Sequence, residues 1–311
     1  MDLAATRAVL APHADVARRL RTAIDLRLGA LLAPSEVEPC ALHRAMRHLV
    51  LAPGKRLRPL LVAMCAIELG GDERDVLDVG CAFELVHAAS LILDDLPCMD
   101  DAGLRRGLPT THVEFGQDVA ILAAIALLGR AFEVVAARRQ TDAAHRVELS
   151  RLLAGCIGSQ GLSGGQFHDL RADQARCDAA SLERRNHAKT GVLFAAAVDA
   201  AAVMHDATPE QRELLRRYAG HLGAAFQICD DIHDATQPAA AVGKDTGKDA
   251  GRATVVTLLG VQEARRAMHA QLRAALGTAR ALARPRAAAP GALVAFLHAA
   301  FGAEMRAVEA E

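Results

Sequence analysis

Glycine and proline residues interrupt this chain at intervals of roughly 15 to 30 residues, and the segments between the interruptions carry the hydrophobic periodicity of helices. No segment shows the alternating, β-branched pattern that predicts a strand. Hydrophobic residues make up 52% of the sequence and aromatic residues only 3%, and much of the apolar content is alanine and leucine, which favours helices over sheets. The sequence therefore predicts an all-α fold. The interruptions lie at residues 34–39, 53–54, 70–71, 103–109, 161–165, 208–209 and 243–251.

The length of 311 residues allows one large domain or two ordinary ones, with a core that needs no disulfide or metal to hold it. Two gaps rich in proline or arginine, at 34–39 and 283–291, are interpreted as surface connections, so we expect a single domain over residues 1–311. One helix start is well specified, because Thr208 can cap, Pro209 takes the first helical position and Gln211 completes a capping box. That helix should run to about Asp234.

The overall charge and the cysteine pattern limit the classes of partner and the compartment. A formal net charge of -1 gives no basic field for nucleic acid or an anionic membrane. Seven cysteines without a CxxC pair favour a reduced, cytoplasmic protein. The N-terminal residues lack the pattern of a secretory signal, and the longest apolar run, 119–129, is too short to cross a bilayer. We therefore expect a cytoplasmic protein with no nucleic-acid partner and no membrane span.

A first cluster of carboxylates stands directly behind an apolar run, in LILDDLPCMDD at residues 91–101. Asp94, Asp95, Asp100 and Asp101 repel one another unless a cation or a basic cluster lies among them. His87 lies two helical turns before Asp94 and should point along the face that ends in these acids, although a lone histidine is as often structural. On this stretch alone, a solvated helix end that needs no cation is the alternative.

A second cluster, FQICDDIHD at residues 226–234, lies inside the helix that begins at Pro209. Asp230 and Asp234 are four residues apart and therefore share a face, with Gln227 one turn earlier on the same side and Asp231 beside them. Apolar neighbours surround these acids, which weakens the alternative of a solvated helix end. The two clusters could face each other across one site.

Basic groups stand where helices begin or loops tighten. In APGKRLRPLL, Lys55 and Arg58 flank the expected start of a helix, where free backbone N–H groups already favour an anion. Each base taken alone is more often a solvated surface charge. Acids and bases together, without a glycine-rich nucleotide loop, suggest a polyphosphate bridged by Mg²⁺, which commonly uses one or two carboxylates plus substrate phosphates. The other candidates are Arg105, Arg106, Lys189, Thr190 and Lys244.

Seven motifs, in order and spacing, resemble those of the trans-isoprenyl diphosphate synthases, the polyprenyl synthetases. They are GKRLRP, DDLPCMDD, LRRG, GGQFHD, AKT, FQICDDIHD and GKD, over about residues 50–260. The stretch HAASLILDDLPCMDDAGLRRGLPT is most similar to the bacterial geranylgeranyl diphosphate synthases of carotenoid pathways. The resemblance implies a large helical bundle around a deep central cavity, the isoprenoid synthase fold, and a homodimer.

The resemblance also implies a role for each motif residue. The enzyme would condense isopentenyl diphosphate with an allylic diphosphate (dimethylallyl, geranyl or farnesyl), with Mg²⁺ as cofactor. Bound metals would be held by Asp94, Asp95, Asp100, Asp230, Asp231 and Asp234, with support from Asp101. The allylic diphosphate would contact Arg105, Lys189 and Lys244, isopentenyl diphosphate would contact Lys55, Arg58, His87 and Arg106, and Gln166 and Asp169 would line the site. Lys189, Thr190 and Gln227 would serve catalysis, Thr190 and Gln227 by presenting oxygen dipoles toward the carbocation.

Three positions depart from the pattern of the family. Leu93 stands where many relatives have histidine, His233 occupies an ordinarily apolar or hydroxyl position, and Arg252 replaces a frequent lysine. None removes an expected ligand. The expected product is geranylgeranyl diphosphate (C20), and the alternative is a C15 synthase. Less favoured are a terpene cyclase, which would not need an anion site at Lys55 and Arg58, and a non-catalytic partner subunit, which would be expected to have lost acids or bases.

The product length should depend on the helix that leads to the first acids. Ala89, Val86 and Phe83 lie five, eight and eleven residues before Asp94, on neighbouring parts of one face. At a rise of about 1.5 Å per residue they sit roughly 7, 12 and 16 Å below the acids. Ala89 should let a growing chain pass, while Phe83 would obstruct it deeper down. The alternative is that Phe83 is an ordinary core residue.

Overall fold

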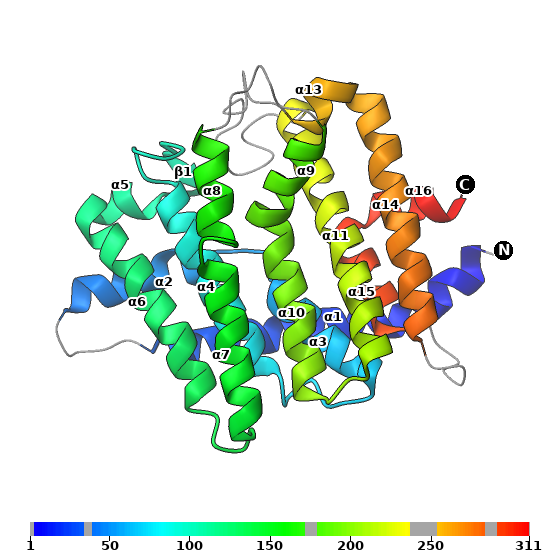
Figure 1. Cartoon of the computed structure of the whole chain (residues 1–311), viewed down its shortest axis with the longest axis horizontal. Helices are drawn as coiled ribbons and strands as arrows, with labels where there is room; N and C mark the ends of the chain where they lie inside the picture. The colour runs from blue at the N-terminus through cyan, green and yellow to red at the C-terminus, as the bar shows by residue number, and fades with distance from the viewer. Residues whose placement is uncertain (1–2, 34–38, 172–178, 237–253, 284–290, 311) are drawn as a thin grey trace.

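The computed structural model describes residues 3–33, 39–171, 179–236, 254–283 and 291–310. Helices dominate these residues, and long helices stand side by side around α4 and α10 (Figure 1). The prediction of an all-α fold is therefore confirmed. The helices are α1 (Leu3–Leu31), α2 (Cys40–Val50), α3 (Leu57–Leu69), α4 (Leu77–Asp94), α5 (Thr111–Phe115), α6 (Gln117–Ala136), α7 (Ala143–Ile157), α8 (Leu162–Arg171), α9 (Ala179–Asn186), the π-helix η2 (His187–Gly191), α10 (Val192–Met204), α11 (Pro209–Thr236), α13 (Val255–Leu259), α14 (Val261–Leu282), α15 (Ala292–Phe301) and α16 (Ala303–Ala310).

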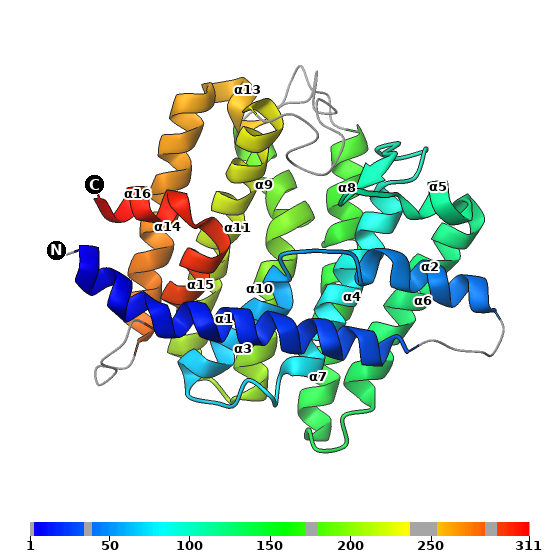
Figure 2. The ribbon, with the colours of Figure 1, turned by 180° about the vertical axis from the view of Figure 1, so that it is seen from behind.

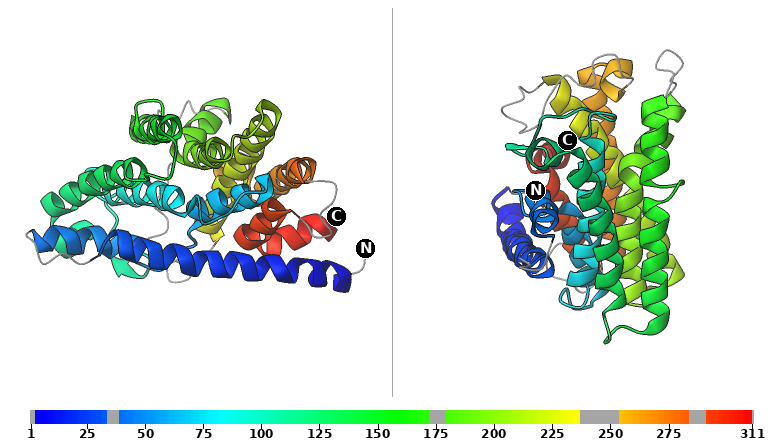
Figure 3. Two further views of the ribbon diagram at one scale, coloured as in Figure 1. Left: turned by 90° about the horizontal axis from the view of Figure 1, so that it is seen from below. Right: turned by 90° about the vertical axis from the view of Figure 1, so that its left-hand side faces the viewer.

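Helix α1 crosses the back of this bundle as a separate layer (Figures 2 and 3). It packs on α3, α4 and α15. Its apolar residues Leu20, Ile24 and Leu28 are spaced four apart and are fully buried, so one stripe of the helix faces the bundle.

The centre of the molecule is occupied by α4 and α10, which are apolar on nearly every side. In α4 the residues from Val79 to Val86 are all buried, Glu84 among them. A helix that is hydrophobic all round belongs in a core. Phe83, Val86 and Ala89, predicted to line the path of the growing chain, are completely buried here.

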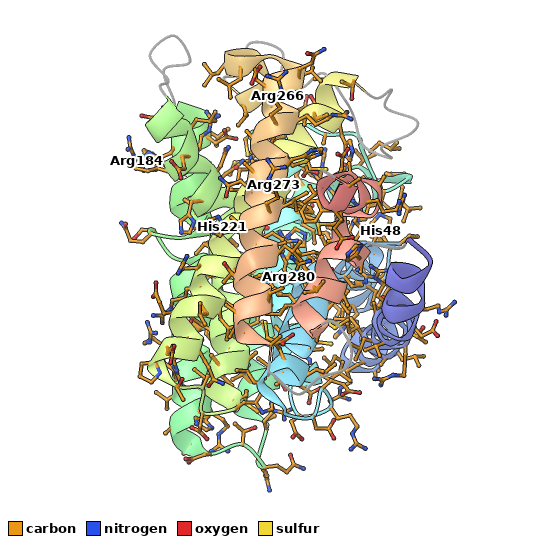
Figure 4. The ribbon with its side chains drawn as sticks, turned by 90° about the vertical axis from the view of Figure 1, so that its right-hand side faces the viewer. His48, Arg184, His221, Arg266, Arg273 and Arg280 are labelled. Atoms are coloured by element: carbon orange, nitrogen blue, oxygen red, sulfur yellow. The ribbon has the colours of Figure 1, made fainter. Side chains whose placement is uncertain are left out.

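Helices α11 and α14 form the most extensively packed pair of the fold. The start of α11 is as predicted: Thr208 Oγ1 accepts from the Gln211 N–H at 3.2 Å, and Gln211 Oε1 accepts from the Thr208 N–H at 2.9 Å. Its end at Thr236 agrees with the predicted end near Asp234. On α14, Leu272 faces the core, whereas Arg266, Arg273 and Arg280 lie along the outward side, as Figure 4 shows.

One small hairpin was not predicted. Strands β1 (Leu104–Arg105) and β2 (Leu108–Pro109) pair antiparallel. The two turn residues Arg106 and Gly107 both have positive φ, 101° and 78°, as two-residue hairpin turns often require. Positive φ is uncommon for arginine, so the surrounding contacts must hold Arg106 in place.

Two segments pass a length and composition test for a membrane span, Gln117–Ala136 and Ser181–Met204. The first segment is the whole of α6 and contains the run 119–129, and the expectation of no membrane span stays a prediction. Core helices of soluble proteins commonly have the same length and apolar composition. Part of the apolar stretch in each segment is buried inside the fold, 39% and 56% respectively.

Candidate active site

The first acidic cluster begins where α4 ends. Asp94 is the last residue of α4, and its carbonyl accepts the Asp100 N–H at 2.9 Å, so the loop folds back and brings these two acids together. Burial raises the pKa of Asp94 to about 6; the Lys189 ammonium opposes the shift and the Asp100 carboxylate adds to it. Asp101 is exposed, with a left-handed φ of 48°. Because ionised Asp94 is unfavourable in this buried position, a cation bound beside it would stabilise the carboxylate.

Asp95 is almost fully buried and is paired within the protein. The Arg105 guanidinium donates from Nε to both carboxylate oxygens at 2.8 Å and from Nη2 to Oδ1 at 2.6 Å. Burial raises the pKa of Asp95, and the hydrogen bonds from Arg105 oppose that rise. In this geometry Asp95 holds Arg105 at the hairpin, and a metal would have to share the carboxylate with it.

In the second acidic cluster, one carboxylate is hydrogen-bonded within the protein and two others lie half-buried on a neighbouring face. Asp231 is buried; its Oδ1 accepts from Gln227 Nε2 at 2.9 Å and its Oδ2 from the Val255 N–H at 3.0 Å, which anchors the start of α13. Asp230 and Asp234 are half-buried on the neighbouring face of α11. The metal role predicted for Asp231 stays a prediction, and both of its oxygens already accept hydrogen bonds.

Lys189 and Thr190 lie on the π-helix η2 between α9 and α10. Such single π-turns occur frequently at functional sites. Thr190 Oγ1 donates to Gln227 Oε1 at 2.8 Å, which extends the chain of bonds to Asp231. Lys189 Nζ donates to Asp169 Oδ2 at 2.8 Å, and Arg185 Nε approaches Asp169 Oδ1 at 3.4 Å.

Three glycines allow the helices around η2 to approach closely. A Cβ at Gly165 on α8 would lie 2.7 Å from the Lys189 backbone N, and one at Gly223 on α11 would lie 3.1 Å from the Gly191 Cα. A Cβ at Gly191 itself would lie 2.7 Å from His187 Nδ1. The position of the π-helix therefore depends on residues without side chains.

The basic groups predicted for isopentenyl diphosphate gather near the start of α3. Arg58 is buried with its guanidinium 5.0 Å from the centre of the Phe194 ring, and burial lowers its pKa to about 10. The pKa of Arg106 is also lowered by burial. Burial, together with the charge of nearby arginines, lowers the pKa of His87 well below its ordinary value, so His87 is neutral at pH 7. Lys55 is exposed at the end of the preceding loop.

These groups converge from distant parts of the sequence. The charge of Asp230 on α11 acts on Arg58 of α3, and Lys189 acts on Asp94 of α4. Gln166 is buried with its Oε1 unbonded to any atom of the described residues, and its Nε2 lies 4.0 Å from the Met99 sulfur. Lys244 and Arg252 fall outside the described residues, and their expected roles stay predictions.

Comparison with known proteins identifies the group to which this arrangement belongs. The profile of the family described as polyprenyl synthetase matches residues 39–289. The chain belongs to the polyprenyl synthetase family. It is 46% identical over 263 residues to the geranylgeranyl diphosphate synthase of Pantoea ananas, covering 83% of this chain and 85% of that protein. Identity to the geranylgeranyl diphosphate synthase of Pseudescherichia vulneris is 42% over 262 residues, 84% of each chain.

Solved structures of similar proteins have the same helical fold. An FPP/GFPP synthase from Zymomonas mobilis, without ligand, is 34% identical, with a TM-score of 0.79 over 93% of this chain and 97% of that one. A geranyltransferase from Helicobacter pylori, complexed with magnesium and isoprenyl diphosphate, is 26% identical, with a TM-score of 0.83 over 96% of this chain and 98% of that one. The isoprenoid synthase fold expected from the sequence is thereby confirmed for this polyprenyl synthetase.

The donor set of this polyprenyl synthetase fits magnesium that is shared with a substrate. No group of three or more histidine, cysteine or acidic residues gathers closely enough to hold a metal within the part of the chain that the structure describes. The acids stand instead on two sides, at the ends of α4 and α11 (Figure 1). Mg²⁺ prefers oxygen ligands and is commonly completed by substrate phosphates, so Asp94, Asp100, Asp230 and Asp234 are suitable donors.

Sequence reasoning missed three charged residues near this site. Arg185 joins Lys189 at Asp169, and its position four residues before Lys189 on one helical face was a usable signal. Arg56 and Glu84 form a buried ion pair at 3.2 Å. A glutamate within the apolar run CAFELV was a signal for such a pair, because a buried charge requires a partner.

Proposed function

We propose that this polyprenyl synthetase is a magnesium-dependent trans-prenyltransferase that condenses isopentenyl diphosphate with allylic diphosphates to give geranylgeranyl diphosphate (C20). The observation that carries the proposal is the convergence of two acidic clusters with two separate sets of bases. Its support from relatives is the identity above 40% to two bacterial geranylgeranyl diphosphate synthases over more than four fifths of the chain. The whole chain 1–311 acts as one catalytic unit in this proposal.

Each substrate would use its own set of residues. Bound magnesium supplies charge neutralisation for the departing diphosphate. Arg105 and Lys189, already oriented by Asp95 and Asp169, stabilise the same negative charge without having to reorganise during the reaction. Thr190, held by Gln227, directs oxygen dipoles toward the developing carbocation. The isopentenyl double bond attacks this cation, and the proton that is lost can pass to the departed diphosphate.

The second anion site argues for a transferase over a lyase. A terpene cyclase ionises one allylic diphosphate and would gain nothing from a second set of bases. Arg58 is buried, Arg106 is half-buried, and Lys55 is exposed just before the start of α3. Lys55 and Arg58 flank the N-terminus of this helix, where free N–H groups add to the attraction for an anion. The retained acids and bases likewise argue against a non-catalytic partner subunit.

The product length would be set on α4. Ala89 leaves space beneath the acids, and Phe83 closes the path two turns deeper, a depth that suits a C20 product over C15. The support for this role is that all three residues of the face are fully buried in a helix that ends at Asp94.

We also propose a cytoplasmic homodimer. Helix α6 exposes Ile121, Leu122 and Ile125, with exposed fractions of 41%, 53% and 58%, on one side of a helix. A contiguous exposed apolar face of this kind is typical of an interaction surface, and a second copy would cover it. Sedimentation of wild type and Ile125→Glu would test the dimer, which the charge should weaken.

The test of the proposed function is a product assay. Purified protein is incubated with isopentenyl diphosphate, Mg²⁺ and a C5, C10 or C15 primer, and the dephosphorylated products are separated by chromatography. We expect C20 product, its loss when magnesium is chelated, and a fall in turnover by on the order of 10² in Asp94→Ala and Asp230→Ala. Wild-type turnover in either folded variant would refute the metal roles.

A further inference from the structure

Arg56 stands between two residues assigned to isopentenyl diphosphate, Lys55 and Arg58, but its side chain is buried in a different set of contacts. Its Nε donates to Asp25 Oδ1 on α1 at 2.7 Å, its Nη2 to the Ala52 carbonyl at 2.8 Å, and its Nη1 to Glu84 Oε1 on α4 at 3.2 Å. One guanidinium thus joins the loop before α3 to two other helices.

The backbone of Arg56 shows that these contacts hold the loop firmly. Arg56 is the N-cap of α3 with φ 49° and ψ 40°, a left-handed conformation that is unfavourable for a residue other than glycine. Such a conformation persists only where the surrounding contacts determine it. Two bases of the predicted anion site are close to it in sequence, Lys55 directly before Arg56 and Arg58 in the first turn of α3, so the conformation of Arg56 affects where both lie.

Glu84 is a buried carboxylate that pairs with Arg56 and whose charge also acts on Arg58 and Arg106. Its Oε1 accepts from Arg56, while its Oε2 has no hydrogen-bond partner within the described ranges of the chain. Burial lowers the pKa of both Arg58 and Arg106, and the charge of Glu84 opposes the shift in each case. A Cβ at Gly54 would lie 3.0 Å from Arg106 Nη1 and 3.3 Å from Arg56 Nη1, so both guanidiniums lie against the same loop.

We propose that Arg56 and Glu84 are positioning residues for the isopentenyl diphosphate site: Arg56 fixes the loop that carries Lys55 onto α1 and α4, and Glu84 is the shared counter-ion that keeps Arg58 and Arg106 in place before the substrate diphosphate arrives. The inference rests on the proposed function. Lysine could not replace Arg56, because a single ammonium cannot reproduce the planar fork that reaches three acceptors on three different segments.

Arg27 supplies a matched control. Its Nε donates to Asp78 Oδ1 at 2.5 Å and its Nη2 to Oδ2 at 3.2 Å, so it also joins α1 to α4 through an arginine–aspartate pair. No hydrogen bond of Arg27 reaches the loop 51–56 among residues that the structure describes. Arg56→Lys and Arg27→Lys therefore make the same chemical change in two links between the same helices, and only one link holds the loop.

The experiment measures kcat, both KM values, melting temperature and the calorimetric affinity for isopentenyl diphosphate alone. In Arg56→Lys and in Glu84→Gln we expect the KM and the dissociation constant for isopentenyl diphosphate to rise about tenfold or more, with the KM for the allylic substrate and kcat within about twofold of wild type. Arg27→Lys should lower the melting temperature and leave both KM values unchanged. In the double variant Arg56→Lys/Glu84→Gln, the KM for isopentenyl diphosphate should rise by less than the product of the two single-variant increases, because Arg56 and Glu84 act as one pair.

Two results would overturn the inference. One is unchanged affinity for isopentenyl diphosphate in folded Arg56→Lys and Glu84→Gln. The other is an equal rise of both KM values in Arg56→Lys and Arg27→Lys, which would mean general loosening of the α1–α4 contact. Asp25→Asn, which removes only the outer contact of Arg56, provides a milder variant and should give a smaller rise. A wild-type protein that makes no prenyl product would refute the proposed function instead, and the calorimetric comparison would still decide the inference.

Discussion

The pKa of Asp94 predicts how magnesium activation should depend on pH. Asp94 is protonated below about pH 6 in the folded protein without metal, and only the ionised carboxylate binds Mg²⁺ well. Competition between proton and metal multiplies the apparent dissociation constant by 1 + 10^(pKa − pH), which is about 1.1 at pH 7 and about 11 at pH 5. The magnesium concentration that gives half-maximal turnover should therefore rise about tenfold between pH 7 and pH 5.

The effect of rising pH on folding stability through Asp94 is opposite in sign to that of a salt-bridged carboxylate. Because the pKa of Asp94 is raised above its ordinary value of 3.8, the folded protein holds this proton to a higher pH than the unfolded chain does. The stability that protonated Asp94 contributes to the folded protein is thus lost as the pH rises through about 6. Binding of magnesium with an allylic diphosphate should restore this stability.

The assay is a magnesium titration of initial rates at several pH values with saturating substrates. Magnesium binding to the substrates alone, measured in the same buffers, is subtracted, since diphosphate oxygens also take up protons. Lys189→Met removes a charge that lowers the pKa of Asp94 and should move the midpoint of the pH dependence upward. A corrected activation constant that is the same at pH 5 and pH 7 would refute the reasoning, as would a midpoint that does not rise in Lys189→Met.

Three further outcomes are expected. Asp95→Asn, which leaves its arginine partner without a counter-ion, should lower the free energy of unfolding by about 3 kcal/mol in denaturant titrations, and a change below about 0.5 kcal/mol would contradict the paired role. Ala89→Phe should shift products from C20 toward C15 and Phe83→Ala should admit longer ones, and chromatograms unchanged in both variants would exclude this face as the ruler. Lys55→Ala should mainly raise the KM for isopentenyl diphosphate and Lys189→Ala that for the allylic substrate, whereas equal effects on both would indicate one shared site.

The long helices were predictable because their signals are local and repeat many times. For α11 a capping box, a proline at the first position and apolar periodicity all agree, and the structure begins the helix at Pro209. The hairpin at 104–109 carries no such signal. Strands of two residues are too short for a period, and the arginine–glycine turn could be recognised only as a breaker between helices.

The site was predictable at the level of charge clusters, whereas individual partners were not. The i, i+4 spacing placed Asp230 and Asp234 on one face, and the same geometry directs Asp231 elsewhere, to Gln227 and the start of α13. The pairing of Asp95 with Arg105 depends on how a loop returns, which sequence spacing does not give. Cooperation between Arg56 and Glu84 depends on the packing of α3 against α4, a contact between segments far apart in the chain.

The close approach of helices at Gly165, Gly191 and Gly223 has a consequence for libraries of random variants. Substitution at these three positions should displace the π-helix and abolish turnover, although none of them carries a chemical group. Gly220 and Gly277 lie on the neighbouring α11 and α14 with open space around the added Cβ, and side chains there should be tolerated. A map of inactivating substitutions would therefore include positions where helices pack closely as well as positions where substrates bind. Measuring the refolding yield of each variant together with its turnover would separate these two classes of position.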